Sequence, residues 1–134
     1  VVTDREQIEL NITGIVRSFE AGDLEQTLSH ISPQAACERA LVQFAIGVIT
    51  FEEPLSLKDY QVTLQNENSI AISTFRANGR VVIRGQPAGH HPSMWQATWR
   101  KEAGVWKLIR IRELDPLRGE PLDRLQGIGA RLCD

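Results

Sequence analysis

The side chains that could support acid and base chemistry are few in this chain and lie far apart in the sequence. Asp59 and Tyr60 are neighbours in the segment SLKDYQVTLQ, and His30 ends a helical pattern. Tyr60 is in phase with Val62 and Leu64, so strand alternation turns it inward and turns Asp59 to the opposite face. We name Tyr60, Asp59 and His30 as weak catalytic candidates. A core tyrosine and a histidine cation at a helix C-terminus are the simpler interpretations.

Two neighbouring histidines, His90 and His91, lie in the segment QPAGHHPS, whose glycine and prolines predict a loop. Imidazoles can bind a metal when Asp or Glu side chains join them, but no metal-site spacing surrounds this pair. We therefore predict an exposed polar loop, no metal site and no cofactor. The sequence also lacks a Ser-His-Asp order, a glycine-rich phosphate loop and a cysteine nucleophile with a supporting motif.

All three tryptophans lie in the segment MWQATWRKEAGVWKLIRIRE, residues 94–113. If this segment is a hairpin, Trp95 and Trp99 share one face of the first strand, and both faces of the hairpin carry apolar residues. A sheet with one wet face does not require two apolar faces. The pattern indicates a core on one side and a dimer or tail-docking surface on the other, with a ligand pocket rimmed by tryptophans as the alternative.

Regular alternation places Arg110 and Arg112 on the same face as Trp106 and Leu108. Their guanidinium groups could bind an anion at the edge of a pocket, whereas paired surface arginines are the simpler interpretation. Base stacking on the tryptophans, with arginines contacting phosphates, is disfavoured because the chain has no basic bias. The candidate ligand-binding residues are Tyr60, Trp95, Trp99, Arg110 and Arg112.

The composition predicts one globular domain without a disulfide framework. The chain has 134 residues, 42% of them hydrophobic, with 15 basic and 17 acidic residues and a net charge of -2. Such a balance gives no overall field that would attract nucleic acid or an anionic membrane, so neither is expected as a partner. Cys37 and Cys133 fit two separate thiols better than a bridge. No apolar run approaches the roughly 18 residues needed to span a bilayer.

Helical periodicity is confined to the first part of the chain. Thr3 or Asp4 can cap a first amphipathic helix that ends at Gly22, and Asp23 can cap a second. Ser32 and Pro33 can open a third helix that is apolar on most sides.

From Leu55 onward the hydrophobic period is two, which indicates strands. We expect one long strand kinked at Asn78-Gly79, with a hairpin turn there as the alternative, and a last hairpin joined at Ala103-Gly104. Three helices followed by an antiparallel meander predict an α+β fold with helices on one sheet face. We place the domain at residues 1–114 and a surface-packed tail at residues 115–134, with a short helix near 122–126.

Two stretches resemble the nuclear-transport-factor-2-like (SnoaL-like, cystatin-type cone) superfamily. IVRSFEAGDLEQTLSHISP is similar to its helical opening, and WRKEAGVWKLIRIRE to its last hairpin. The resemblance covers about residues 4–114. It implies a strongly curved antiparallel sheet wrapped around the helices, a conical cavity and a dimer formed through the sheet. The superfamily includes isomerases, dehydratases and hydrolases as well as binding domains, so the resemblance implies no activity.

From these observations we predict a cone domain that is non-catalytic and serves small-ligand binding or protein association. The alternative is a SnoaL-like enzyme that uses general acid and base groups in the cone cavity. The expected partners are a small hydrophobic molecule and a second copy of the chain. The expected compartment is the cytoplasm, or an extracytoplasmic one if a signal or anchor was removed before Val1.

Overall fold

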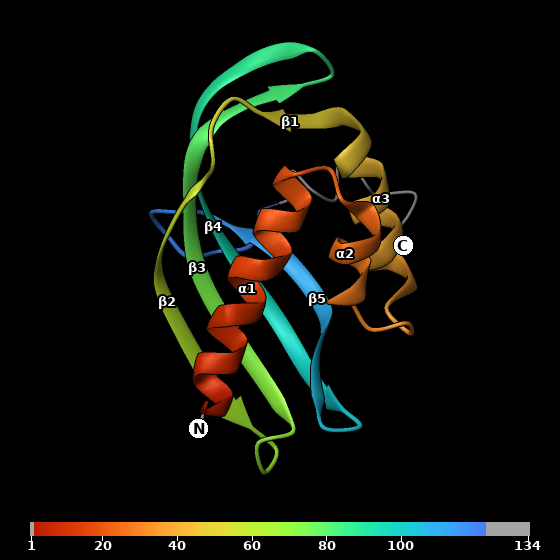
Figure 1. The fold of residues 1–134 in the computed structure, drawn as a ribbon. Coiled ribbons are helices and arrows are strands. Elements are labelled where there is room, and N and C mark those ends of the chain that lie inside the picture. Colours follow the sequence, from red (N-terminus) through yellow and green to blue (C-terminus); the bar gives the residue numbers. More distant parts are fainter. Residues whose placement is uncertain (1, 123–134) are drawn as a thin grey trace.

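The protein is an α+β fold in which helices pack on one face of a strongly curved antiparallel sheet (Figure 1). The computed structural model describes residues 2–122, which form α1 (Asp4–Glu20), α2 (Leu24–Ser29), α3 (Ala36–Val48), β1 (Ile49–Phe51), β2 (Ser56–Gln65), β3 (Ile70–Ile83), β4 (Gln86–Glu102) and β5 (Val105–Leu114). Strand β3 pairs with β1, β2 and β4, and β5 pairs with β4. We call the concave side, which holds the helices, the inner face and the other side the outer face. Among these described residues, no helix is long and apolar enough to span a membrane.

The first two helices begin where the sequence predicts. The Thr3 hydroxyl accepts the Glu6 backbone N–H at 3.2 Å, and the Asp23 carboxylate accepts the Gln26 N–H at 3.0 Å. Gly22 takes a positive φ of 73° in the tight turn between the helices, a conformation that costs glycine little. The caps and the turn therefore confirm the local prediction.

The third helix begins at Ala36, not at Ser32 and Pro33 as expected. The Ser32 backbone N–H donates to the Leu108 carbonyl at 2.8 Å, so this segment extends the edge of β5 instead of starting a helix. The Ser32 hydroxyl also donates to Glu102 at 2.8 Å. Sheet pairing thus delays the helix by about one turn.

Strands β3 and β4 form one long hairpin. Strand β3 runs unbroken through Asn78-Gly79, as predicted, and turns at Arg84-Gly85, where both residues have positive φ. The loop expected at residues 86–93 is wrong, because this segment is the first half of β4 and pairs with β3. A register shift next to Gly89 leaves one extra residue in β4 and so lets the strand continue through this irregular segment. The hydrogen bonds with β3 therefore outweigh the local preference of Gly and Pro for a loop.

The space between α1 and the inner face is filled by large side chains. Trp99 is 0% exposed, as are Ile8 and Ile12 of α1, and Phe75 is 4% exposed. The Trp99 indole N–H donates to the Ser73 hydroxyl at 3.0 Å, and that hydroxyl donates to a β4 carbonyl at 2.9 Å. Burial of the indole therefore leaves its polar atom hydrogen-bonded.

Asp4 links the first turn of α1 to the last hairpin by hydrogen bonds. Its carboxylate accepts the Trp106 indole N–H at 3.1 Å and the Lys101 ammonium at 3.2 Å. The hydrogen bond from Trp106, and then that from Lys101, hold the pKa of Asp4 below its usual value because both favour the ionised carboxylate. The same contact joins residues that are about a hundred positions apart in the sequence.

Cys37 on α3 is disulfide-bonded, so the expectation of two separate thiols is wrong. The chain's other cysteine, Cys133, lies outside the described residues.

The described part of the tail returns to β5, where the Leu122 N–H donates to the Glu113 carbonyl at 2.8 Å. Almost all of the short helix expected at 122–126 lies outside the described residues, and the boundary at residue 114 stays a prediction.

The packing of Trp99 predicts a large loss of stability on truncation. We expect Trp99→Ala to lower the free energy of unfolding by about 3–5 kcal/mol, because it removes a fully buried ring and leaves a cavity. Urea denaturation checks this value. Leu117→Ala is the control, since Leu117 is 96% exposed and its loss should change stability by less than about 0.5 kcal/mol. A loss for Trp99→Ala as small as that of the control would contradict the filled interior.

Candidate functional site

Tyr60 lies on the inner face, where its hydroxyl and its ring both contact other side chains. Its hydroxyl is 3.2 Å from the Thr13 hydroxyl on α1, and its ring stacks on Phe75 with centroids 6.4 Å apart. The side chain is half-buried against the core cluster. This geometry is that of a core tyrosine with a satisfied hydroxyl.

Asp59 points away from the core, as strand alternation predicted. It has a positive φ of 59° at a β-bulge between Lys58 and Gln61, and its exposed carboxylate lies 3.4 Å from the Arg76 guanidinium. The sheet therefore separates Asp59 from the interior that Tyr60 faces. The two candidates cannot act as an acid and base pair on one inner site.

His30 is the C-cap residue of α2, and its imidazole packs on α1. A methyl group added at Gly14 would lie 3.2 Å from two ring atoms of His30. Burial, and then repulsion from Lys107, lower the pKa of His30 below its usual value. The predicted place of His30 at the helix C-terminus is confirmed, but the environment favours the neutral ring over the expected cation.

Arg110 and Arg112 lie on the outer face, so the predicted phase is wrong. Trp99 pairs with Leu108, but the preceding residue Thr98 pairs with Arg110, which leaves Ile109 as an extra residue in β5. Such a β-bulge reverses the alternation of all residues beyond it. Trp106 and Leu108 consequently face the helices, whereas both arginines face away from them.

The predicted ligand-binding residues are divided between the two faces. Trp99 is enclosed, and the indole N–H of the half-buried Trp95 donates to the Ser93 hydroxyl at 2.9 Å. Together with Tyr60 these rings belong to the inner face, while Arg110 and Arg112 are on the outer face. The outer face of the hairpin is mixed: the positions opposite these arginines are the polar Gln96 and Thr98, while Met94 and Leu114 form an apolar pair beyond them.

A surface depression of about 420 Å³ lies beside the bulge of β2. Arg76 and Met94 belong to the outer face, and Asp59 pairs with Arg76 at its rim. The sequence analysis named two of its lining residues, Asp59 and Tyr60, as candidates, but it missed Arg76 and the other lining residues. The available signal was that Arg76 is out of phase with the buried Phe75. The lining residues are Asp59, Tyr60, Gln61, Thr74, Arg76 and Met94.

The histidines of the second candidate pair lie on a strand. His90 is exposed and pairs with Arg80 across β3, and His91 pairs with Gly79. Within residues 2–122, the structure holds no group of three or more His, Cys, Asp or Glu side chains placed to bind a metal ion. The geometry of the described part therefore offers no assignment of a metal to this pair.

Comparisons with solved structures identify the architecture. An NTF2-like protein of unknown function in nutrient uptake from Rhodospirillum rubrum is 18% identical, with a TM-score of 0.65 over 78% of this chain and 93% of that one. An NTF2-like protein with a cystatin-like fold from Novosphingobium aromaticivorans is 17% identical, with a TM-score of 0.61 over 98% and 89%. This chain has the nuclear-transport-factor-2-like fold. The predicted superfamily architecture is thereby confirmed.

A third NTF2-like neighbour, from Streptomyces avermitilis, is provisionally named a dehydratase. It is 18% identical, with a TM-score of 0.64 over 81% of this chain and 92% of that one. Comparisons with protein-family models and with curated proteins find no match. At these identities the similarity shows the NTF2-like fold and not an activity.

The environment of His30 predicts a pH-dependent stability. A folded-state pKa below the unfolded value of about 6.5 favours the neutral ring, so its contribution is complete above that pH and decreases as the pH falls towards the folded pKa. We expect stability to fall between about pH 7.5 and about pH 5.5, and His30→Gln to reduce that fall. Urea denaturation at both pH values measures it. His90→Gln, at an exposed position, should keep the wild-type dependence. An unchanged dependence in His30→Gln would contradict this role.

Proposed function

We propose that this chain is a non-catalytic association domain, in which the NTF2-like fold serves as a filled scaffold and partners bind on its surface. The observation that carries the proposal is the complete burial of Trp99, which with Phe75 occupies the space between α1 and the sheet. A catalytic cone needs an open cavity in which polar groups converge on a substrate. The packing found here supports a structural interior instead.

The positions of the acid and base candidates favour the same function. Tyr60 bonds to Thr13 on the inner side, Asp59 pairs with Arg76 on the outer side, and His30 packs on α1. General acid and base catalysis requires such groups within hydrogen-bonding reach of one substrate, and of these three only Asp59 and Tyr60 share a place, the lining of the surface depression. The alternative of a dehydratase-type or other SnoaL-like enzyme, which the provisional name of one neighbour raises, would need a site other than the cone centre.

Small-ligand binding is the second candidate function, and the depression of about 420 Å³ favours it. Ligand sites commonly have volumes of about 300–1,000 Å³. Its rim carries the Asp59 and Arg76 pair, which suits a polar ligand better than the hydrophobic one expected from the sequence. Chemical shifts of Gln61, Thr74 and Arg76 in a fragment titration by NMR would separate this candidate from association alone.

An apolar dye tests whether the cone is closed. We expect the neutral dye N-phenyl-1-naphthylamine to show no saturable fluorescence increase with the wild-type protein, because the buried rings of Trp99 and Phe75 occupy the interior. Trp99→Ala is the matched variant, since removal of a buried ring leaves an apolar cavity that can take up an aromatic molecule. Trp99→Leu is a milder variant if the alanine protein does not fold. Saturable binding at one site of the wild-type protein would overturn the filled-scaffold proposal.

The homodimer through the sheet stays a prediction. The sequence-based reason, a second apolar face of the last hairpin, is weakened because Arg110 and Arg112 and the opposing Gln96 and Thr98 occupy the middle of that face, with Met94 and Leu114 beyond them. A symmetric dimer across this surface would oppose like charges, so we favour association with a different partner.

A further inference from the structure

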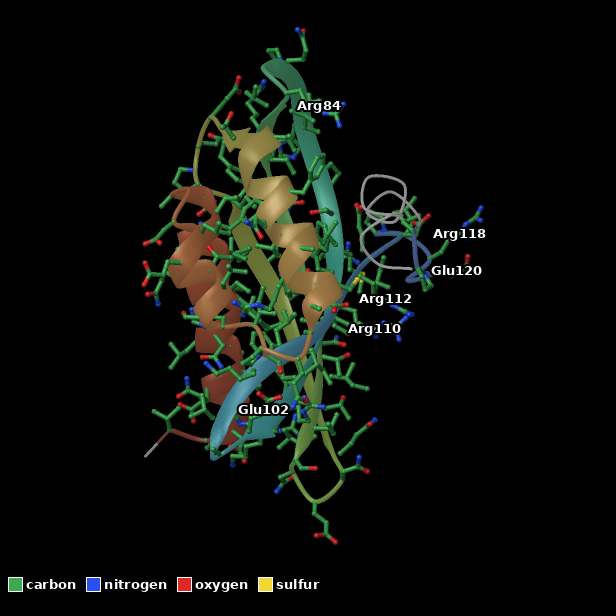
Figure 2. The ribbon with its side chains drawn as sticks, turned by 90° about the vertical axis from the view of Figure 1, so that its right-hand side faces the viewer. Arg84, Glu102, Arg110, Arg112, Arg118 and Glu120 are labelled. Atoms are coloured by element: carbon green, nitrogen blue, oxygen red, sulfur yellow. The ribbon has the colours of Figure 1, made fainter. Side chains whose placement is uncertain are left out.

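The outer face is basic although the chain as a whole is slightly acidic. Sixteen outer side chains stand in four cross-strand rows, and six of them are Lys or Arg while none is Asp or Glu. Asp59 and Glu102 lie at the margin of the rows, and the described tail, with Arg118 and Glu120, lies beyond Leu114, which is only 5% exposed (Figure 2). We call these sixteen residues the basic face. They are Lys58, Arg76, Met94 and Leu114; Gln61, Thr74, Gln96 and Arg112; Thr63, Ile72, Thr98 and Arg110; and Gln65, Ile70, Arg100 and Lys107.

The remainder of the chain carries the opposite charge. Of the 15 basic and 17 acidic residues in the sequence, the basic face with its margin holds six basic and two acidic ones. The face is therefore positive by four, and the other residues together are negative by six. The net charge of -2 hides this separation.

Arg110 and Arg112 are two adjacent cations of this face that have no partner among the described residues, and the exposed Lys58 on β2 is a third. Arg76 lies 3.4 Å from Asp59 and Arg100 lies 2.6 Å from Glu102, so both already have an acidic partner. Arg110 and Arg112, by contrast, have no hydrogen bond or ion pair with any residue of the described range. Figure 2 shows both side chains on the side of the sheet away from the helices.

We infer that the basic face is a docking surface for an acidic, extended segment of a partner protein, with Arg110 and Arg112 as its anchors. This inference rests on the proposed association function. Arg110 and Arg112 are alternate residues of one strand, so they stand roughly 7 Å apart. Carboxylates at alternate positions of an extended segment have the same spacing, and a guanidinium group binds a carboxylate through two parallel hydrogen bonds.

The uncharged residues between the cations suit a peptide. Gln96 and Thr98 lie directly across from Arg112 and Arg110, and Thr74 continues the row on β3. Amide and hydroxyl groups can donate to and accept from a peptide backbone. They give an acidic segment contacts beyond charge, which a purely electrostatic surface would lack.

Other anionic partners fit this face less well. Single-stranded nucleic acid binds through aromatic side chains on which bases stack, and none of the sixteen residues is aromatic. A flat anionic membrane would touch a strongly curved convex face over only part of its area (Figure 1). A second copy in a symmetric dimer would bring two positive faces together.

Fluorescence anisotropy with a labelled peptide of alternating Asp and Ser residues tests the inference. We expect the peptide to bind the wild-type protein more weakly as salt increases, and a Lys and Ser peptide not to bind. The double variant Arg110→Glu and Arg112→Glu should weaken binding by about tenfold or more. Arg80→Glu with Arg84→Glu is the matched control, because it makes the same change in net charge at the far end of the β3–β4 hairpin (Figure 2). The double variant Arg110→Lys and Arg112→Lys keeps the positive charge. It should weaken peptide binding less than the Glu double variant does.

Each other outcome overturns the inference. Equal weakening by both double variants would mean a response to net charge and not to this face. Tighter binding of an oligothymidine strand, or of vesicles containing phosphatidylserine, would assign the face to nucleic acid or membrane. If light scattering finds a dimer that the 110 and 112 variants dissociate, the occupant is a second copy, and the association function stands without an acidic partner. The apolar-dye experiment tests that function independently.

Discussion

One extra residue in β5, Ile109, determines which side chains of the sheet edge reach the core and which reach solvent. Side chains alternate along a strand with a period of two, so an insertion of one residue exchanges the faces beyond it. Before the bulge, Trp106 and Leu108 pack on the helices. Beyond it, Arg110 and Arg112 point outward. Regular alternation would have buried two guanidinium groups among apolar side chains, at a cost of several kcal/mol for each unpaired ion.

The division of faces determines which large side chains pack between α1 and the sheet. With the arginines outside, the inner face is free to take the indole rings and the isoleucines of α1. The buried polar atoms then find partners locally, as Ser73 does for Trp99 and Asp4 for Trp106. No buried side-chain polar atom of residues 2–122 lacks a hydrogen bond. Such local pairing lets the interior bury indole and hydroxyl groups without the cost of an unmade hydrogen bond.

The sequence predicted correctly those features that depend on interactions between residues close together in the chain. The caps at Thr3 and Asp23 and the inward position of Tyr60 depend on neighbouring residues, and all were predicted. The strand at residues 86–93 depends on pairing with β3, which outweighed its Gly and Pro residues. The face of Arg110 depends on the bulge, and a bulge without a glycine has no clear sequence signal. The fold was thus predictable, whereas the charged outer surface was not.

Because positive and negative residues lie on different sides of the molecule, the net charge of the chain is a poor guide to which partners it attracts. A near-neutral total argued against a field over the whole molecule, yet the fold gathers the cations of four strands on one side. The Debye length is about 8 Å at physiological salt, so a partner approaching the basic face senses mainly that face and not the acidic helices behind it. Orientation on encounter therefore depends on local potential, which only the pairing register reveals. The register of the strands, and not the composition, therefore decides where on the molecule a charged partner would be attracted.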